Sequence, residues 1–176
     1  MTENKTVLIV VLEGCCEGEA VRQTLENFGY IVVNYGIGRP QHLIDILAGK
    51  TIMPFDYIIF SCHGDDDGMV MVELGEDIYT PDEPRGNFGP NEINKYLALK
   101  DTCIINMGCS TGREDLAKAF AKNGNTYLAP KDDIGNGFMF VALFFYYLSE
   151  HGLSATEAHQ KAAALDEETG LYGLWK

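Results

Sequence analysis

The sequence has few basic residues. Its 13 Lys and Arg face 26 Asp and Glu, which gives a net charge of −13 and a pI of about 4.6. A negatively charged surface repels nucleic acids and anionic membranes and attracts basic partners. The alternative explanation is that this charge only keeps the protein soluble. We therefore expect no nucleic acid or membrane partner, and a polypeptide partner of basic character.

Closely spaced cysteine pairs are also lacking. The five cysteines form an odd set without a C-x-x-C pair, which excludes a disulfide framework and a zinc ribbon. Reduced thiols of this kind are typical of a cytoplasmic protein, and we expect that location. A metal site built from Cys15, Cys62, His63 and Cys109 has no support in their spacing, so we predict neither a metal nor an organic cofactor.

Long apolar runs are missing as well. The longest, Phe138–Leu148, is well short of the roughly 20 residues that span a bilayer. The N-terminal MTENKTVLIV has no basic stretch ahead of an apolar core, so we expect no export signal.

What the sequence does contain is an alternation of apolar β runs with amphipathic segments. This rhythm predicts one α/β domain over residues 1–176, with a mostly parallel sheet and helices on both faces. A small hairpin, Met69–Glu73 with Asp77–Thr80, interrupts it. The predicted strands are 5–12, 30–35, 55–62, 103–107, 126–130 and 170–175, and the predicted helices are 19–28, 39–48, 91–99, 113–122, 136–150 and 155–166.

Two of the predicted strands end in residues suited to catalysis. His63-Gly64 closes the third strand, and Cys109 follows the fourth in the stretch TCIINMGCSTG. Adjacent parallel strands lie about 4.8 Å apart, so their end side chains come within or near hydrogen-bonding reach. An imidazole beside a thiol makes a nucleophile, and the N–H groups of Gly64 and Cys109 are suited to an oxyanion hole. The structural alternative is a core cysteine beside an ordinary histidine.

A second pattern overlaps the first. Gly108–Gly112 reads G-x-S-x-G, the nucleophile elbow of α/β hydrolases, with Ser110 as nucleophile. His151 or His159 would then have to serve as the base, although both fall in or beside predicted helices. Nearer the N-terminus, we expect Cys15 and Cys16 to fill the turn after the first strand and Glu13 to be solvated.

The ordered pair FSCHGDDDG and INMGCSTG resembles the two catalytic strand ends of the caspase-like cysteine peptidases, the group of caspases, gingipains, clostripain, separases and CHAT domains. The histidine precedes the cysteine by 46 positions (109 minus 63), close to the roughly 50 found in caspases. An aromatic helix, GLSATEAHQKA and LYGLW are similar to the CHAT and gingipain branch. This resemblance implies a caspase-like three-layer sandwich with strand order 2-1-3-4-5-6.

The resemblance also implies roles for residues. His63 is the expected general base, Cys109 the nucleophile, and the amides of Gly64 and Cys109 the oxyanion donors of an endopeptidase that needs no cofactor. MGC replaces the caspase QAC triplet, and the arginines that select aspartate have no match. Relatives that cleave after Lys or Arg use an acidic pocket, for which the candidates are Asp132, Asp133 and Asp65–Asp67, with Ser110 also in the substrate-binding set. The alternative function is a catalytically silent interaction module.

Overall fold

The computed structural model describes residues 5–12 and 14–176, so the predicted solvation of Glu13 lies outside the described residues. Its centre is a six-stranded sheet in the order β2-β1-β3-β6-β7-β8. The numbers differ from the predicted 2-1-3-4-5-6 because the two hairpin strands, β4 and β5, lie between β3 and β6 in the chain. The six strands are β1 (Thr6–Val11), β2 (Ile31–Gly36), β3 (Tyr57–Ser61), β6 (Cys103–Asn106), β7 (Thr126–Pro130) and β8 (Tyr172–Trp175).

All neighbouring strands of this sheet are parallel except β7 and β8, which are antiparallel. The strands β1, β3 and β6 are apolar along their lengths because both of their faces are covered. The carboxyl ends of β1, β3, β6 and β7 consequently meet at one edge of the sheet.

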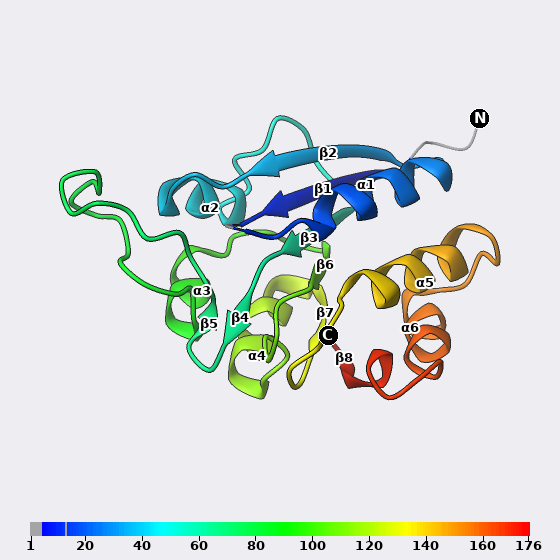
Figure 1. The fold of residues 1–176 in the computed structure, drawn as a ribbon. Coiled ribbons are helices and arrows are strands. Elements are labelled where there is room, and N and C mark those ends of the chain that lie inside the picture. The colour runs from blue at the N-terminus through cyan, green and yellow to red at the C-terminus, as the bar shows by residue number, and fades with distance from the viewer. Residues whose placement is uncertain (1–4, 13) are drawn as a thin grey trace.

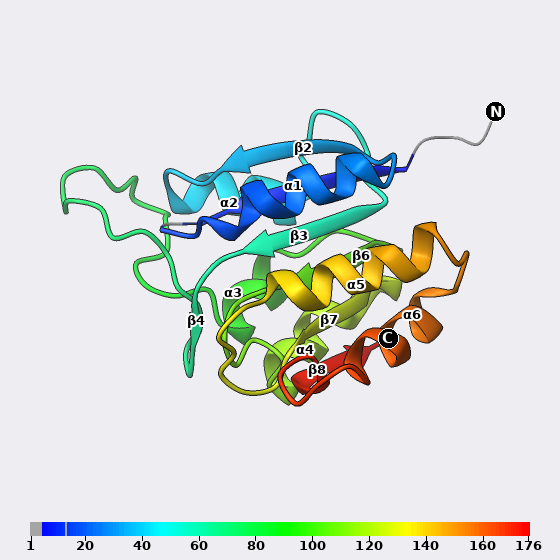
Figure 2. The ribbon, with the colours of Figure 1, turned by 45° about the vertical axis from the view of Figure 1, so that its right-hand side comes forward.

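Helices cover both faces, as Figures 1 and 2 show. On one face lie α1 (Glu17–Asn27), α5 (Phe138–Ser149) and α6 (Ala155–Ala163); on the other lie α2 (Pro40–Leu47), α3 (Pro90–Tyr96) and α4 (Glu114–Ala121). Short 3-10 turns occupy Lys122–Gly124 and Thr169–Leu171. The predicted three-layer α/β class is therefore confirmed. None of the described helices has the length and apolar character that crossing a bilayer requires.

Each face has its own hydrophobic core. Side chains of α1, α5 and α6 pack on one face of the sheet around the fully buried Phe144 and Phe145. On the other face Phe120 of α4 stacks on Tyr127 of β7, with ring centroids 4.5 Å apart. Burial of aromatic surface on this scale dominates the stability of a small domain.

The hairpin is not where the sequence predicted it. It pairs β4 (Gly64–Asp65) with β5 (Gly68–Met69), and residues 76–78 form a turn in a long loop before α3. Asp65 decides this position, because its Oδ1 accepts the N–H groups of Asp67 (2.8 Å) and Gly68 (3.1 Å). The apolar run Met69–Val72 predicted a longer strand paired with Asp77–Thr80, whereas only Met69 belongs to a strand, β5.

Other predicted ends are confirmed within a few residues. Ser154 caps α6: its hydroxyl accepts the Glu157 N–H, and Glu157 Oε2 accepts the Ser154 N–H, which completes a capping box. The strand Thr126–Pro130 has the predicted bounds.

Candidate active site

His63 stands at the carboxyl end of β3. The strand and Cys62 are buried, whereas His63 is exposed. The chain then turns into the hairpin, and the N–H of Val70 donates to the His63 carbonyl at 3.0 Å. The imidazole approaches the β1–α1 turn: a Cβ built on Gly14 would lie 3.8 Å from its Nε2. His63 is therefore fixed at the sheet edge by its backbone and open to solvent through its ring.

Cys109 lies in the turn between β6 and α4, and hydrogen bonds from buried side chains fix the backbone of this turn. The buried Asn106 Oδ1 accepts the N–H of Gly108 at 2.9 Å and the Cys62 thiol at 3.2 Å. The Thr111 hydroxyl donates to the Gly108 carbonyl at 2.7 Å. The half-buried Cys109 is thus presented by a turn whose backbone is held on both sides.

The sheet register pairs the two strands up to a few residues before His63 and Cys109. In the β3–β6 pair, Tyr57 is opposite Cys103 and Phe60 is opposite Asn106, a constant offset of 46 positions. His63 and Cys109 differ by the same 46 positions but lie beyond the last paired residues, Phe60 and Asn106. The sequence prediction that these strands are neighbours with ends at one edge is therefore confirmed.

Two glycines let the backbones touch at this junction. A Cβ on Gly64 would lie 2.2 Å from the Cys109 carbonyl oxygen and 3.1 Å from its nitrogen. A Cβ on Gly108 would lie 3.1 Å from the Gly64 nitrogen. Within the described part of the chain the Cys109 N–H donates to no acceptor. This amide therefore lies beside Gly64 at the edge of the sheet without a protein acceptor among the described residues.

Most of the acids predicted for the specificity pocket make hydrogen bonds to their own or neighbouring loops. Asp65 serves the hairpin turn, and its Oδ2 also accepts from the Asn87 amide at 2.7 Å. Asp132 and Asp133 are exposed in the β7–α5 loop, where Asp132 Oδ1 accepts the Asp133 N–H and Asp133 Oδ1 accepts the Ser110 hydroxyl. Asp66 pairs with Arg113 at 3.1 Å, and all five of these aspartates are exposed at the surface.

Ser110 has no histidine partner among the described residues. Its φ of 56° is left-handed, and its hydroxyl points to Asp133 at 3.1 Å. His159 Nε2 lies 2.7 Å from the Tyr172 carbonyl, and His151 packs against Tyr146. The nucleophile-elbow interpretation therefore lacks its base.

Glu17, the first residue of α1, was missed by the sequence analysis. It is half-buried at the same edge, and burial raises the pKa of its carboxyl, while the backbone N–H groups of Phe138 and Gly137 and the nearby His63 lower it. Nothing in EGCCEGEA distinguished it from its neighbouring glutamates. The difference appears only in the packing of α1 against α5.

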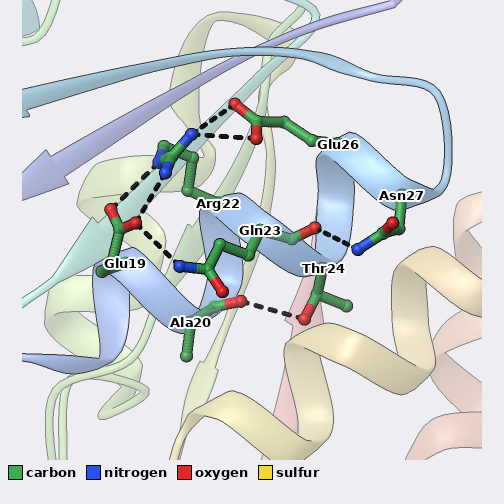
Figure 3. Close-up of polar contacts among 7 residues, drawn as sticks. All are labelled: Glu19, Ala20, Arg22, Gln23, Thr24, Glu26 and Asn27. Carbon is green, nitrogen blue, oxygen red and sulfur yellow. Dashed lines mark hydrogen bonds and ion pairs between the residues drawn. The ribbon is translucent and has the colours of Figure 1, made fainter.

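The other acids of α1 are paired. Arg22 bridges Glu19 and Glu26 on the solvent face, as Figure 3 shows, at 2.6 and 2.7 Å. The Arg22 guanidinium lowers the pKa of Glu19 to about 2. Glu17 has no such cation beside it within residues 5–12 and 14–176.

The five cysteines occupy different environments. Burial raises the pKa of the Cys103 thiol to about 12 and that of Cys62 further, and it also raises the pKa of the half-buried Cys15. Cys16 is exposed at the start of α1. No group of three or more potential metal ligands occurs in the described part of the chain.

Comparison with protein-family models and with curated proteins finds no match. Among solved structures the chain is similar to a secreted C11 cysteine protease from Bacteroides thetaiotaomicron, determined with an irreversible peptide inhibitor, at a TM-score of 0.54 and 9% identity. The match covers 93% of this chain and 59% of that one, so this chain spans about three fifths of its relative's length. A match to drICE has a TM-score of 0.43 and 10% identity, covering 98% of this chain and 90% of that one. The chain has the caspase-like fold, shared with this C11 cysteine protease.

Proposed function

We propose that the protein is a cysteine endopeptidase in which Cys109 attacks the scissile carbonyl and His63 is the base. The observation that carries this proposal is the close approach of the two backbones just beyond β3 and β6, where a Cβ on Gly108 would lie 3.1 Å from the His63 carbonyl carbon and one on Gly64 would lie 3.1 Å from the Cys109 nitrogen. His63 takes the thiol proton, and the sulfur forms a bond to the carbonyl carbon. The N–H of Cys109, with that of Gly64, stabilises the oxyanion.

The later steps follow from the same groups. His63 gives its proton to the leaving amine as the C–N bond breaks, which leaves a thioester on Cys109. Water, deprotonated by His63, then attacks the thioester and releases the acid and the thiol. Every proton transferred in this reaction passes through the His63 imidazole, so the reaction needs no metal or organic cofactor.

Glu17 supports a preference for Lys or Arg before the scissile bond. It is half-buried at the same sheet edge, near His63, and pairs with no Lys or Arg among the described side chains. A lysine or arginine side chain of the substrate would supply that charge. This proposal replaces the aspartates of the sequence prediction with a glutamate from the start of α1.

A library of peptides varied at the residue before the cleaved bond tests the function and this preference together. The wild type should cleave after Lys or Arg, and Glu17→Gln should lower kcat/KM for those peptides about 10- to 100-fold, the effect of a charged hydrogen bond. Glu150→Gln is the matched control, because it removes a charge at the far end of α5. Cleavage after aspartate, or an unchanged profile in Glu17→Gln, would contradict the assignment.

The same carboxyl predicts a pH dependence of the preference. A raised pKa means that Glu17 takes up a proton at a pH above 4.5, its ordinary value. The ratio of kcat/KM for Lys and Arg peptides to that for peptides with an uncharged residue at the same place should therefore fall as the pH drops through that raised pKa. In Glu17→Gln this ratio should not change with pH, whereas the acidic limb that comes from protonation of the base His63 should remain in both proteins.

The second candidate function is a silent interaction module with the same fold. The exposure of His63 and the partial exposure of Cys109 favour the enzyme, since an unused pair has no need to reach solvent at one level of the sheet. Peptide hydrolysis by the wild type, absent in Cys109→Ala, separates the two.

A further inference from the structure

The loop between β7 and α5 runs directly past the Cys109 thiol. The Cys109 Sγ donates to the Ile134 carbonyl at 3.5 Å. One residue further on, the Ser110 N–H donates to the Asp132 carbonyl at 3.2 Å, and its hydroxyl donates to Asp133. The position of this loop therefore sets what the thiol contacts.

Glu168 holds the other side of this loop. Its Oε1 accepts two successive backbone N–H groups, those of Gly135 and Asn136, the second at 2.8 Å. These groups follow Ile134 immediately. A Cβ on Gly135 would lie 3.1 Å from the same oxygen, so a glycine suits this close approach.

Glu168 lies in a segment, residues 166–171, that is held by its own hydrogen bonds. The adjacent Thr169 is 3% exposed, and its N–H donates to Asp166 Oδ1 at 2.8 Å. The start of the loop joins the same segment, because the Lys131 N–H donates to the Leu171 carbonyl at 3.0 Å. The Glu168 carboxylate thus links residues 166–171 to the loop between β7 and α5.

We propose that Glu168 is a positioning residue that holds the Ile134 carbonyl against the Cys109 thiol by accepting the N–H groups of Gly135 and Asn136. The carbonyl keeps Sγ turned in one direction, and the loop forms one wall around it. The catalytic consequence rests on the proposed peptidase function, whereas the loop contact itself does not.

The test compares Glu168→Ala, Glu168→Asp and Glu168→Gln, with Glu167→Ala as control because Glu167 is exposed and makes no side-chain hydrogen bond within the described residues. Glutamine keeps an oxygen at the same reach, whereas aspartate keeps the charge but is one methylene shorter. Three quantities are measured: amide exchange of residues 134–138, the rate of Cys109 alkylation by iodoacetamide, and kcat/KM for a peptide ending in Lys.

The alanine and aspartate variants should exchange these amides at least about tenfold faster, in proportion to a lost charged hydrogen bond. Cys109 should then be alkylated severalfold faster, while kcat/KM falls about 10- to 100-fold because the thiol is misplaced. The glutamine variant should stay within about threefold of the wild type. The aspartate variant serves if the alanine variant fails to fold.

The proposal would be overturned if the amide-exchange and alkylation rates of Glu168→Ala and Glu168→Asp equalled those of Glu167→Ala. It would also be overturned if Glu168→Gln were as impaired as Glu168→Ala. If neither the wild type nor any of these variants hydrolyses peptides, the proposed function fails. Exchange and alkylation still decide the role of Glu168 in that case.

Discussion

Replacing Cys109 with alanine should lower kcat/KM for peptide hydrolysis at least about 1,000-fold, because no other side chain at this edge can take over the attack. Ser110, the next residue, has its hydroxyl on Asp133. Cys15 lies near but carries a thiol whose pKa is raised by burial. The rate at which each protein releases product from chromogenic peptides gives the result, measured down to the detection limit of the assay.

Cys16→Ala is the matched control for this change. Cys16 is exposed and sits at the start of α1, so its loss removes a thiol without touching the β6–α4 turn. Its activity should remain within twofold of the wild type. Residual hydrolysis by Cys109→Ala that a fluorophosphonate abolishes would instead point to Ser110.

Replacing Gly64 with alanine should destabilise the fold by about 3 kcal/mol, the upper end of the usual cost of overpacking, and abolish most activity. The added methyl would lie 2.2 Å from the Cys109 carbonyl oxygen and 2.7 Å from Thr111 Cγ2. The first neighbour is backbone, which cannot rotate away, so the junction between the two strand ends must open. A displacement of about 1 Å at the reacting atoms costs on the order of 100-fold in rate.

Gly36→Ala provides the control for Gly64→Ala. Gly36 lies at the end of the edge strand β2, is exposed, and has no atom within 4 Å of a built Cβ. Its midpoint of urea unfolding should match that of the wild type. A Gly64→Ala protein with wild-type stability and turnover would show that the two strand ends do not meet as described.

The parts of the site that follow strand ends could be predicted from the sequence. Continuous apolar runs predicted parallel strands, and parallel strands bring His63 and Cys109 to one edge whatever the loops do. Over the paired residues, the register between β3 and β6 has the same offset of 46 positions that separates His63 from Cys109.

The acidic residues were less predictable because their roles depend on contacts between distant loops. Asp132 and Asp133 follow a strand as a pocket acid would, yet both are exposed. Glu168 meets Gly135 across 33 positions, and Glu17 meets the start of α5 through the packing of two helices. Neither contact has a periodicity or a motif that would reveal it in a single sequence.

Covalent labelling with a peptidyl acyloxymethyl ketone carrying Lys tests most directly whether Cys109 is a nucleophile activated by His63. Peptide mapping near pH 7 should find the label on Cys109 and on no other cysteine, since burial disfavours the thiolates of Cys62 and Cys103. His63→Ala should slow this labelling at least about 100-fold, the usual contribution of a general base. Equal, slow labelling of Cys109 and Cys16, unchanged in His63→Ala, would contradict the peptidase proposal and leave a silent interaction module.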